Sequence, residues 1–215
     1  MKNVLIVGAH GQIGQFVVQK LQDQEDFSPI AMVRKEDQLK EFKENKVEAV
    51  MGNLEDSVDD LAKVFKGSDA VVFTAGSGGS TGPEKTVAID LDGAIKSIDA
   101  AEKAGVKRFV MVSAMLTDDR DQWPEEMKTY YIAKYYADRA LKNSKLDYTI
   151  IRPGMLENEA PKGKVSVGDK PKAKSVPRED VAEVIVEVLA QNNTIHKTFD
   201  LVSGEEEVKE AIKNI

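Results

Sequence analysis

Short apolar runs alternate along this chain with longer segments whose apolar residues recur at helical spacing. Several runs are apolar at consecutive positions, which is typical of strands covered by helices on both faces of a parallel sheet. The pattern predicts strands at 4–7, 29–33, 47–50, 70–73, 108–112 and 148–151, and helices near 12–24, 35–44, 57–66, 84–104 and 126–143. Because strands and helices alternate, we predict an α/β fold with a doubly wound parallel sheet. Leu91, Ile95 and Ile98 share one helical face, which we expect to lie against this sheet.

The pattern changes in the last third of the chain. Residues 157–177 are rich in proline, lysine and glycine. Beyond the regular alternation we predict a strand at 164–167, a helix at 178–190, a strand at 198–202 and a short helix near 205–213. Since no internal repeat or linker is visible, we expect a single domain over 1–215, in which about 155–215 form a small substrate-covering extension that is not autonomous.

Composition and charge argue against several functional classes for this protein. Of the 215 residues, 41% are hydrophobic and 31% are charged, which is enough apolar material for a sizeable core. The formal net charge of −7 argues against a dedicated nucleic-acid or anionic-membrane partner. The chain has no cysteine, which excludes a disulfide scaffold, a thiolate nucleophile and a zinc–thiolate site, and we expect no metal centre.

The apolar runs also bear on where the protein works. The first run, Val4 to Val7, stops at Gly8 and is too short for the apolar stretch of an export signal. No run approaches the roughly 20 residues that a membrane-spanning helix needs. We therefore expect a cytoplasmic protein without a membrane partner.

A glycine-rich loop follows the first predicted strand and opens the first predicted helix. Its spacing is G-x-x-G-x-x-G, from Gly8 to Gly14. Glycines at such a turn let the backbone approach a pyrophosphate closely, and N–H groups of the first helical turn then point at the anion. We therefore expect a dinucleotide-binding Rossmann fold whose loop residues Gly8, His10, Gly11, Gln12, Ile13 and Gly14 contact the cofactor. His10 is interpreted as a turn residue and not as a catalyst.

The end of the second predicted strand indicates which dinucleotide is bound. NAD-binding units usually place Asp or Glu there, about 20 residues beyond the loop, to bind the ribose 2′-hydroxyl. This chain has Arg34 followed by Lys35. A guanidinium pairs with a 2′-phosphate, which a carboxylate would repel, so we predict NADP (NADPH) as the cofactor. A solvated basic start of the next helix is the alternative interpretation.

Further motifs follow the later strands in a consistent order. They are Asn53-Leu54, Ala75-Gly76, Ser113, the Y-x-x-x-K element of Tyr130 and Lys134, and Arg152-Pro153-Gly154. With the glycine loop they resemble the short-chain dehydrogenase/reductase superfamily. The loop spacing and the runs 146–154 and 176–182 are most similar to its atypical branch, whose members are labelled NAD-dependent epimerase/dehydratase-like or NAD(P)H-binding proteins. The resemblance implies cofactor contacts from Asn53, Leu54, Ala75, Gly76, Lys134 and Pro153.

The resemblance also implies a catalytic set of Ser113, Tyr130 and Lys134. Tyr130 and Lys134 are four residues apart and share a helix face, so we expect the ammonium to lower the pKa of the phenol. Tyr130 would then protonate a carbonyl oxygen as hydride arrives, while Ser113 stabilises the charge on that oxygen. Asp90, the fourth predicted catalytic residue, stands where many relatives carry an Asn that supports a proton relay, and its charge changes the local electrostatics.

The same residues also allow purely structural interpretations. Four tyrosines on one predicted helix also suit an ordinary half-buried face, and Ser113 also suits a strand end. Met115, Trp123 and Pro124 could line an apolar substrate pocket or cap the core. The lysines between 162 and 174 suit either a solvated loop or a site for an anionic substrate or partner.

Three functions are compatible with these residues. The first expectation is an NADP(H)-dependent oxidoreductase that reduces a small carbonyl, quinone or flavin-like acceptor. The alternative is a non-catalytic NADP(H)-binding module with a redox-sensing or regulatory role. An epimerase or isomerase is less favoured, because only a short segment follows Arg152. The expected partner is a small-molecule substrate, and monomer and homodimer are both open.

Overall fold

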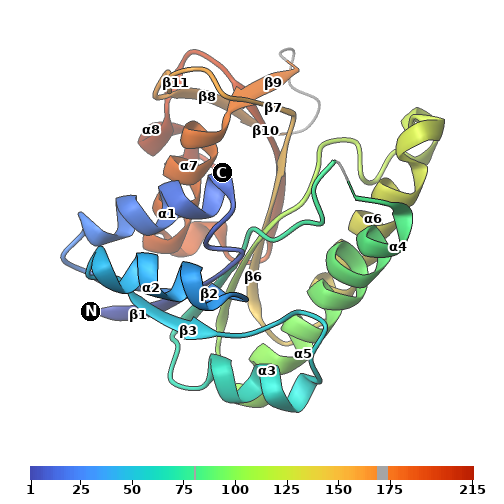
Figure 1. Ribbon diagram of the computed structural model, residues 1–215. Helices are drawn as coiled ribbons and strands as arrows, with labels where there is room; N and C mark the ends of the chain where they lie inside the picture. The colour runs from blue at the N-terminus through green and yellow to red at the C-terminus, as the bar shows by residue number, and fades with distance from the viewer. Residues whose placement is uncertain (80, 169–173) are drawn as a thin grey trace.

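The computed structural model describes residues 1–79, 81–168 and 174–215. In this part of the chain the main feature is a nine-stranded sheet of order β11-β8-β10-β6-β5-β4-β1-β2-β3 (Figure 1). Its strands are β1 (Lys2–Val7), β2 (Phe27–Val33), β3 (Glu48–Met51), β4 (Ala70–Phe73), β5 (Arg108–Val112), β6 (Asp147–Pro153), β8 (Lys164–Gly168), β10 (Lys197–Ser203) and β11 (Glu206–Glu207). Neighbours from β3 to β10 are parallel, and β8 pairs antiparallel with β10 and β11. The predicted doubly wound parallel sheet is confirmed, with an antiparallel edge.

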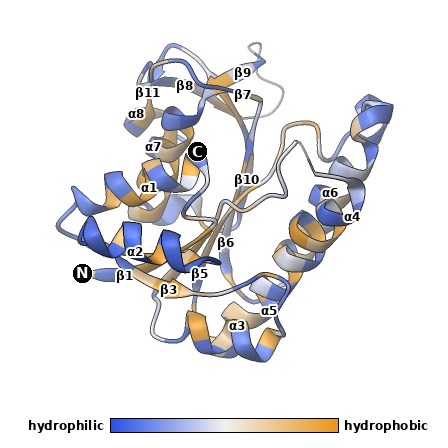
Figure 2. Cartoon of the chain, in the orientation of Figure 1, coloured by the Kyte–Doolittle hydropathy of each residue, from blue (hydrophilic) through white to orange (hydrophobic). Residues whose placement is uncertain are grey.

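Helices cover both faces of this sheet (Figure 1). On one face lie α1 (Gln12–Gln22), α2 (Glu36–Glu44) and α7 (Arg178–Ala190), and on the other lie α3 (Val58–Phe65), α5 (Ala94–Ala104) and α6 (Lys128–Lys142). The short α8 (Val208–Lys213) packs on α7. Short 3₁₀ turns occur at η2 (Arg120–Gln122), η3 (Glu125–Met127) and η4 (Asn192–Thr194). Figure 2 shows hydrophobic strands between helices that carry both hydrophobic and hydrophilic positions.

The consecutive apolar residues of the strands pack alternately into the hydrophobic cores on the two faces of the sheet. In β1, Val4 and Ile6 belong to the core under α1 and α7, whereas Leu5 and Val7 belong to the core under α3 and α5. Successive side chains of a strand point to opposite faces, so a strand with a core on each side needs an apolar residue at every position. This is the physical reason for the run pattern in the sequence.

The single helix predicted at 84–104 is divided. It consists of α4 (Pro83–Lys85), the π-helical segment η1 (Thr86–Gly93) and α5. A π-helical turn contains more residues than an α-helical turn, so it shifts which side chains face inward. Ile98 is buried in the core as predicted, but Leu91 and Ile95 are half-buried and lie outside the core clusters, so the prediction is wrong for these two. Asp90 is buried instead.

The C-terminal segment adds a small second sheet that the sequence did not predict. β7 (Met155–Glu157) and β9 (Ser175–Pro177) pair in parallel. Each strand is only three residues long, and the surrounding segment is polar and proline-rich, so neither produces a clear alternation. Because β7 follows β6 after a single residue, the small sheet lies at the carboxyl end of β6 (Figure 1). The predicted helix at 178–190 is present as α7.

Candidate functional site

The residues predicted for the site gather at one edge of the sheet. Gly8 follows β1, Arg34 follows β2, Asn53 and Ala75 come two residues after β3 and β4, Ser113 follows β5, and Pro153 ends β6. The strand order reverses between β1 and β4. In open α/β sheets, ligands bind in the crevice outside the carboxyl ends of the strands at such a switch point. The topology therefore brings the predicted residues to the edge where a ligand is expected.

The glycines of the first loop are required by close backbone packing. Gly8 has a φ of +86°, and a Cβ there would lie 2.7 Å from the backbone nitrogen of Ala75. A Cβ at Gly14 would lie 2.3 Å from the carbonyl oxygen of Gly8. Gly11 turns the chain into α1, and its N–H donates to the Gly8 carbonyl at 2.9 Å. Larger residues would push the loop away from α1 and from the segment after β4.

The start of α1 fits a phosphate group. The first N–H groups of a helix have no partner within the helix, and the N-cap Gly11 has no side chain that could accept from them. Gly11 and Gln12 are exposed, whereas Ile13 is buried in the core and can offer only its backbone. These donors and the positive end of the helix dipole suit the pyrophosphate of a dinucleotide.

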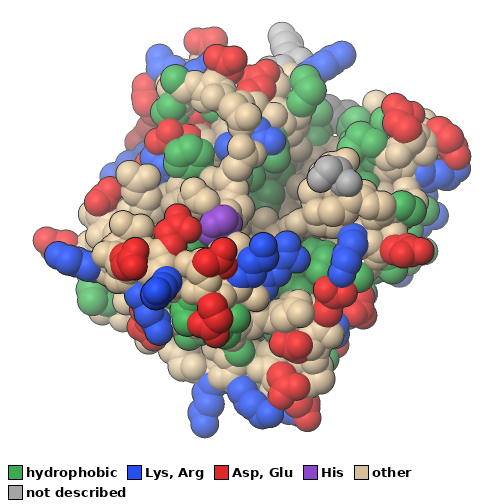
Figure 3. All heavy atoms as spheres, in the orientation of Figure 1, with side chains coloured by type: hydrophobic (Ala, Val, Ile, Leu, Met, Phe, Trp, Pro, Cys, Tyr) green, Lys and Arg blue, Asp and Glu red, His purple; other side chains and the backbone are tan. Residues whose placement is uncertain are grey.

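Basic side chains lie on the segments that follow β1, β2 and β4. Arg34 is exposed directly after β2. Lys85 Nζ lies 2.8 Å from Glu55 Oε1, and this contact, with a smaller contribution from the charge of Arg34, lowers the pKa of Glu55. His10 Nε2 lies 3.3 Å from Glu41 Oε2. Figure 3 shows this face hollowed near its middle, with Lys and Arg side chains gathered below the hollow.

Asn53 forms a tight turn after β3. Its N–H donates to Asp56 Oδ2 at 3.2 Å, and its Oδ1 accepts from the N–H of Glu55 at 3.1 Å. The side chain of Leu54 is buried and packs against Gly93. Leu54 can therefore offer a cofactor only its backbone, whereas the half-buried Asn53 lies at the edge of the crevice.

Tyr130, Lys134 and Asp90 form a cluster beside this edge, in which Lys134 and Asp90 are buried and Tyr130 is half-buried. Lys134 Nζ lies 5.7 Å from the centre of the Tyr130 ring and 3.5 Å from Asp90 Oδ1. It also donates to the carbonyl oxygen of Val112 at 3.3 Å, directly before Ser113. Lys134 is only 5% exposed and Asp90 only 1%. The structure thus brings together three of the four residues predicted for catalysis.

Asp90 connects this cluster to the loop after β4. Its Oδ2 accepts from the N–H of Ser77 at 2.9 Å. A Cβ at Gly76 would lie 3.1 Å from Asp90 Oδ1, so the exposed Gly76 lets the loop run close to the carboxylate. Asp90 is therefore an ionic partner of Lys134 and an anchor for the segment that contains Ala75 and Gly76.

The electrostatics of the cluster differ from the expectation. Burial raises the pKa of Tyr130, Lys134 offsets only part of this, and Asp90 and Asp138 raise it further. The expected pKa below the ordinary value is therefore wrong: Lys134 does lower the pKa of this phenol, but burial, with smaller contributions from Asp90 and Asp138, outweighs it. Burial lowers the pKa of Lys134, but Tyr130, Asp90 and Asp138 outweigh burial and raise it above its ordinary value.

Ser113 lies next to a carboxyl group that the sequence analysis missed. Ser113 is 5% exposed, and its hydroxyl lies beside Asp138, which is 3% exposed. Among the described residues, neither Ser113 Oγ nor Asp138 Oδ1 makes a well-formed hydrogen bond. Burial raises the pKa of Asp138, and Ser113 and Arg152 lower it in part. The four-residue spacing from Tyr130 to Lys134 extends to Asp138, and this helical spacing could have identified it.

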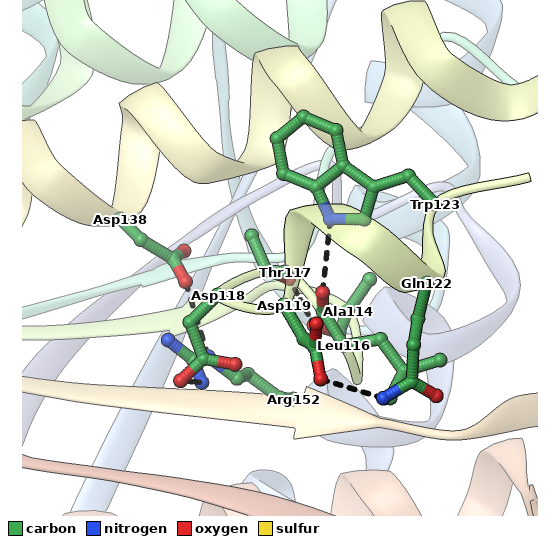
Figure 4. A network of polar contacts seen from close by, with 9 residues as sticks. All are labelled: Ala114, Leu116, Thr117, Asp118, Asp119, Gln122, Trp123, Asp138 and Arg152. Atoms are coloured by element: carbon green, nitrogen blue, oxygen red, sulfur yellow. Dashed lines mark hydrogen bonds and ion pairs between the residues drawn. The ribbon is translucent and has the colours of Figure 1, made fainter.

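Arg152 links three parts of the site. Its Nε lies 3.2 Å from Asp138 Oδ2 on α6, and its Nη1 lies 2.6 Å from Asp118 Oδ2 in the segment after β5 (Figure 4). Burial raises the pKa of Asp118, but the hydrogen bond and charge of Arg152 outweigh this and lower it. The neighbouring Pro153 accepts a hydrogen bond from the N–H of Met115 at 2.9 Å.

Aromatic side chains continue outward from Tyr130. Its ring meets Tyr131 edge to face at 5.6 Å between centroids, and Tyr131 stacks on Trp123 at 5.9 Å with 17° between planes. Met115, Trp123 and Pro124 are all half-buried. Trp123 thus reaches Tyr130 only through Tyr131, and the interpretation that Met115, Trp123 and Pro124 line a substrate pocket stays a prediction.

The lysine-rich segment is described only in part. The N–H groups of Lys162 and Gly163 donate to the buried Asp180 at the start of α7. Lys164 Nζ lies 3.8 Å from Glu207. Lys170 and Lys172 lie outside the described residues. The described part is thus an ordered segment tied to α7.

In residues 1–79, 81–168 and 174–215, no group of three or more His, Cys, Asp or Glu side chains is arranged to hold a metal ion. None of the helices in these ranges has both the length and the apolar character needed to cross a bilayer.

Known proteins share this architecture over the whole chain. The chain is 49% identical over 212 residues to the uncharacterized sugar epimerase YhfK of Bacillus subtilis, covering 99% of each chain. It superposes with a TM-score of 0.94 on a structure from Bacillus halodurans assigned as an NAD-dependent epimerase/dehydratase, at 44% identity and with full coverage of both chains. Sanguinarine reductase of Eschscholzia californica is 36% identical over 138 residues, which are 59% of this chain and 49% of the reductase.

The family match covers the glycine loop, the cluster of Tyr130, Lys134 and Asp90, and α7. Residues 8–192 match the model of a family described as NAD(P)H-binding. This match agrees with the geometry of the switch point and of the loop from Gly8 to Gly14. The chain belongs to the family described as NAD(P)H-binding, and its fold is a Rossmann fold.

Proposed function

We propose that this protein is an NADP(H)-dependent reductase of a small carbonyl, quinone or flavin-like acceptor. One observation carries the proposal: Lys134 is buried 5.7 Å from the Tyr130 ring, beside the edge where the cofactor loop lies. A buried ammonium next to a phenol is costly unless its surroundings compensate, and such groups concentrate at functional sites. The reductase relative supports the same class of reaction.

Arg34 supports NADPH over NADH as the electron donor. It stands where NAD-binding units usually carry a carboxylate, and it is exposed and thus free to meet a 2′-phosphate. Lys85 is largely neutralised by Glu55, so Arg34 is the better candidate for this contact. The N–H groups at the start of α1 would hold the pyrophosphate.

The residues of the cluster have distinct roles in this proposal. The reduced nicotinamide, when bound, supplies a hydride to the acceptor. Tyr130 holds its proton firmly, because its pKa is raised, and can release it to the acceptor oxygen that gains negative charge. Lys134 stabilises the phenolate that remains after proton transfer, and Asp90 keeps Lys134 oriented. Ser113 donates a hydrogen bond to the same oxygen if its hydroxyl turns away from Asp138.

Oxidation of NADPH with a panel of aldehydes, quinones and flavins tests this function. Tyr130→Phe should lower kcat by about 100-fold or more, which is the contribution typical of general acid catalysis. Tyr136→Phe is the matched control, because Tyr136 is exposed on the same helix and should leave kcat unchanged. If Tyr130→Phe retains full kcat with every acceptor, Tyr130 is not the proton donor.

A non-catalytic NADP(H)-binding module is the second candidate. The buried position of the Ser113 hydroxyl, beside Asp138 and with little access to solvent, favours it. Saturable NADPH binding without oxidation by any acceptor would support this candidate. The epimerase named among the relatives suggests a third test, in which a sugar substrate would be isomerised without net consumption of NADPH.

A further inference from the structure

The segment between β5 and α6 folds as a preformed unit. The hydroxyl of Thr117 donates to the Ala114 carbonyl, and Trp123 Nε1 donates to the Leu116 carbonyl at 3.0 Å (Figure 4). Gln122 Nε2 donates to Asp119 Oδ2 at 2.6 Å. These bonds hold the indole of Trp123 to its own loop, residues 114–127.

An ion pair between an exposed carboxylate and a buried guanidinium attaches this loop to the sheet. Asp118 Oδ2 lies 2.6 Å from Arg152 Nη1, while the Asp118 side chain stays 66% exposed and that of Arg152 is only 7% exposed. Figure 4 shows Asp118 and Asp138 pointing toward Arg152 from different segments. The planar guanidinium of Arg152 contacts Asp118 through Nη1 and Asp138 through Nε. Because the directions of these N–H groups are fixed, the ion pair with Asp118 orients the loop relative to β6.

The buried end of this link reaches the proposed catalytic cluster. Arg152 Nε lies 3.2 Å from Asp138, which stands one helical turn beyond Lys134 and beside Ser113. At the other end, Trp123 stacks on Tyr131, the neighbour of Tyr130. The loop is therefore held by two contacts near the cluster. The ion pair with Arg152 leads to Asp138, one helical turn from Lys134, and the stacking of Trp123 leads to Tyr131, next to Tyr130.

We propose that Asp118 and Arg152 form a latch, anchored by Asp138, that positions the loop 114–127 and its Trp123 beside the acceptor site. All three are positioning residues and none is required to touch the cofactor. The expected effect on the KM for an acceptor rests on the proposed reductase function, whereas the expected position of the loop and of Trp123 does not. Arg152 and Asp138 are buried charges, so their removal can prevent folding, and Asp118 is the residue to change.

Trp123 is the only tryptophan of the chain, so its fluorescence reports on the loop directly. The variant is Asp118→Asn, and the control is Asp121→Asn, which removes the same charge from an exposed position in the same loop. Asp118→Asn should raise the acrylamide quenching constant of Trp123 about two-fold and the KM for an acceptor several-fold. The Kd for NADPH should stay unchanged. Asp121→Asn should match the wild type in all three quantities, and Asp118→Glu should restore low quenching.

Salt supplies an independent arm of the test. Because the pair is partly exposed, about 1 M NaCl should raise quenching in the wild type and have little further effect in Asp118→Asn. A folded Asp118→Asn variant whose quenching constant without added salt equals that of the wild type would overturn the latch, and so would wild-type quenching that does not change with salt. The quenching result needs no turnover, so it decides on the latch even if no acceptor is reduced. Turnover of the wild type without any latch effect would leave the reductase function standing.

Discussion

Lys134 Nζ lies 3.5 Å from Asp90 Oδ1, and the two side chains are only 6% and 2% exposed. A buried ammonium and carboxylate at this distance compensate each other, and each would be costly alone. Burial is the main reason for the raised pKa of Tyr130, and the two charges of the pair act on it in opposite directions: Lys134 lowers it and Asp90 raises it.

Asp90→Asn should lower the free energy of unfolding by about 3 kcal/mol, the loss typical when one partner of a buried pair is removed. Asparagine still offers an oxygen to the N–H of Ser77, so the change isolates the charge. Urea unfolding measures the loss. The control is Asp92→Asn, whose exposed pair with Lys96 should contribute less than about 1 kcal/mol. Equal stability of the two variants would show that the buried pair does not stabilise the fold.

The raised pKa of Tyr130 predicts the alkaline behaviour of reduction. A phenol whose pKa lies above its ordinary value of 10 stays protonated, so kcat for acceptor reduction should not fall with this group until the pH exceeds 10. The same shift affects the free energy of unfolding. The folded state holds this proton more tightly than the unfolded state, so the contribution of Tyr130 to stability is constant below pH 10 and decreases as the pH rises above 10. A pH profile of kcat checks this, and a decline centred near pH 8 that disappears in Tyr130→Phe would contradict it.

Gly14→Ala should abolish NADPH binding in the folded protein. Its Cβ would lie 2.3 Å from the Gly8 carbonyl oxygen, so α1 must move away from the loop and carry its N–H groups with it. Fluorescence titration with NADPH measures the loss, and circular dichroism shows whether the fold persists. Gly82→Ala serves as the control because a Cβ there meets no atom within 4 Å. Unchanged affinity in a folded Gly14→Ala variant would contradict the assigned role of the loop.

The regular part of the fold could be predicted because its strands carry unambiguous local patterns. The strands 70–73 and 108–112 have the predicted bounds, since 70–73 is a fully apolar run between polar residues and 108–112 is an apolar run that opens with Arg108. The small β7 and β9 could not be found, because three-residue strands carry too little periodicity. The π-helical segment before α5 was missed for a related reason: helical spacing assumes a constant number of residues per turn.

The candidate site could be predicted residue by residue but not in its electrostatics. Strand ends place Gly8, Arg34 and Ser113 at one edge, which follows from topology alone. The pairing of Asp90 with Lys134 depends on the π-helical turn, which rotates Asp90 into the interior. Likewise, the proximity of Ser113 to Asp138 depends on how α6 packs on β6, which spacing within one element does not reveal.

The most direct test of the account is calorimetric titration of the protein with NADPH and NADH. The wild type should bind NADPH more tightly, and Arg34→Ala should weaken NADPH binding by about 10-fold or more, as expected for loss of a charge-assisted hydrogen bond, with NADH affinity unchanged. Lys43→Ala, which removes an exposed charge further along α2, should change neither value. Failure of the folded wild type to bind either cofactor, or equal loss of both affinities in Arg34→Ala, would contradict the account.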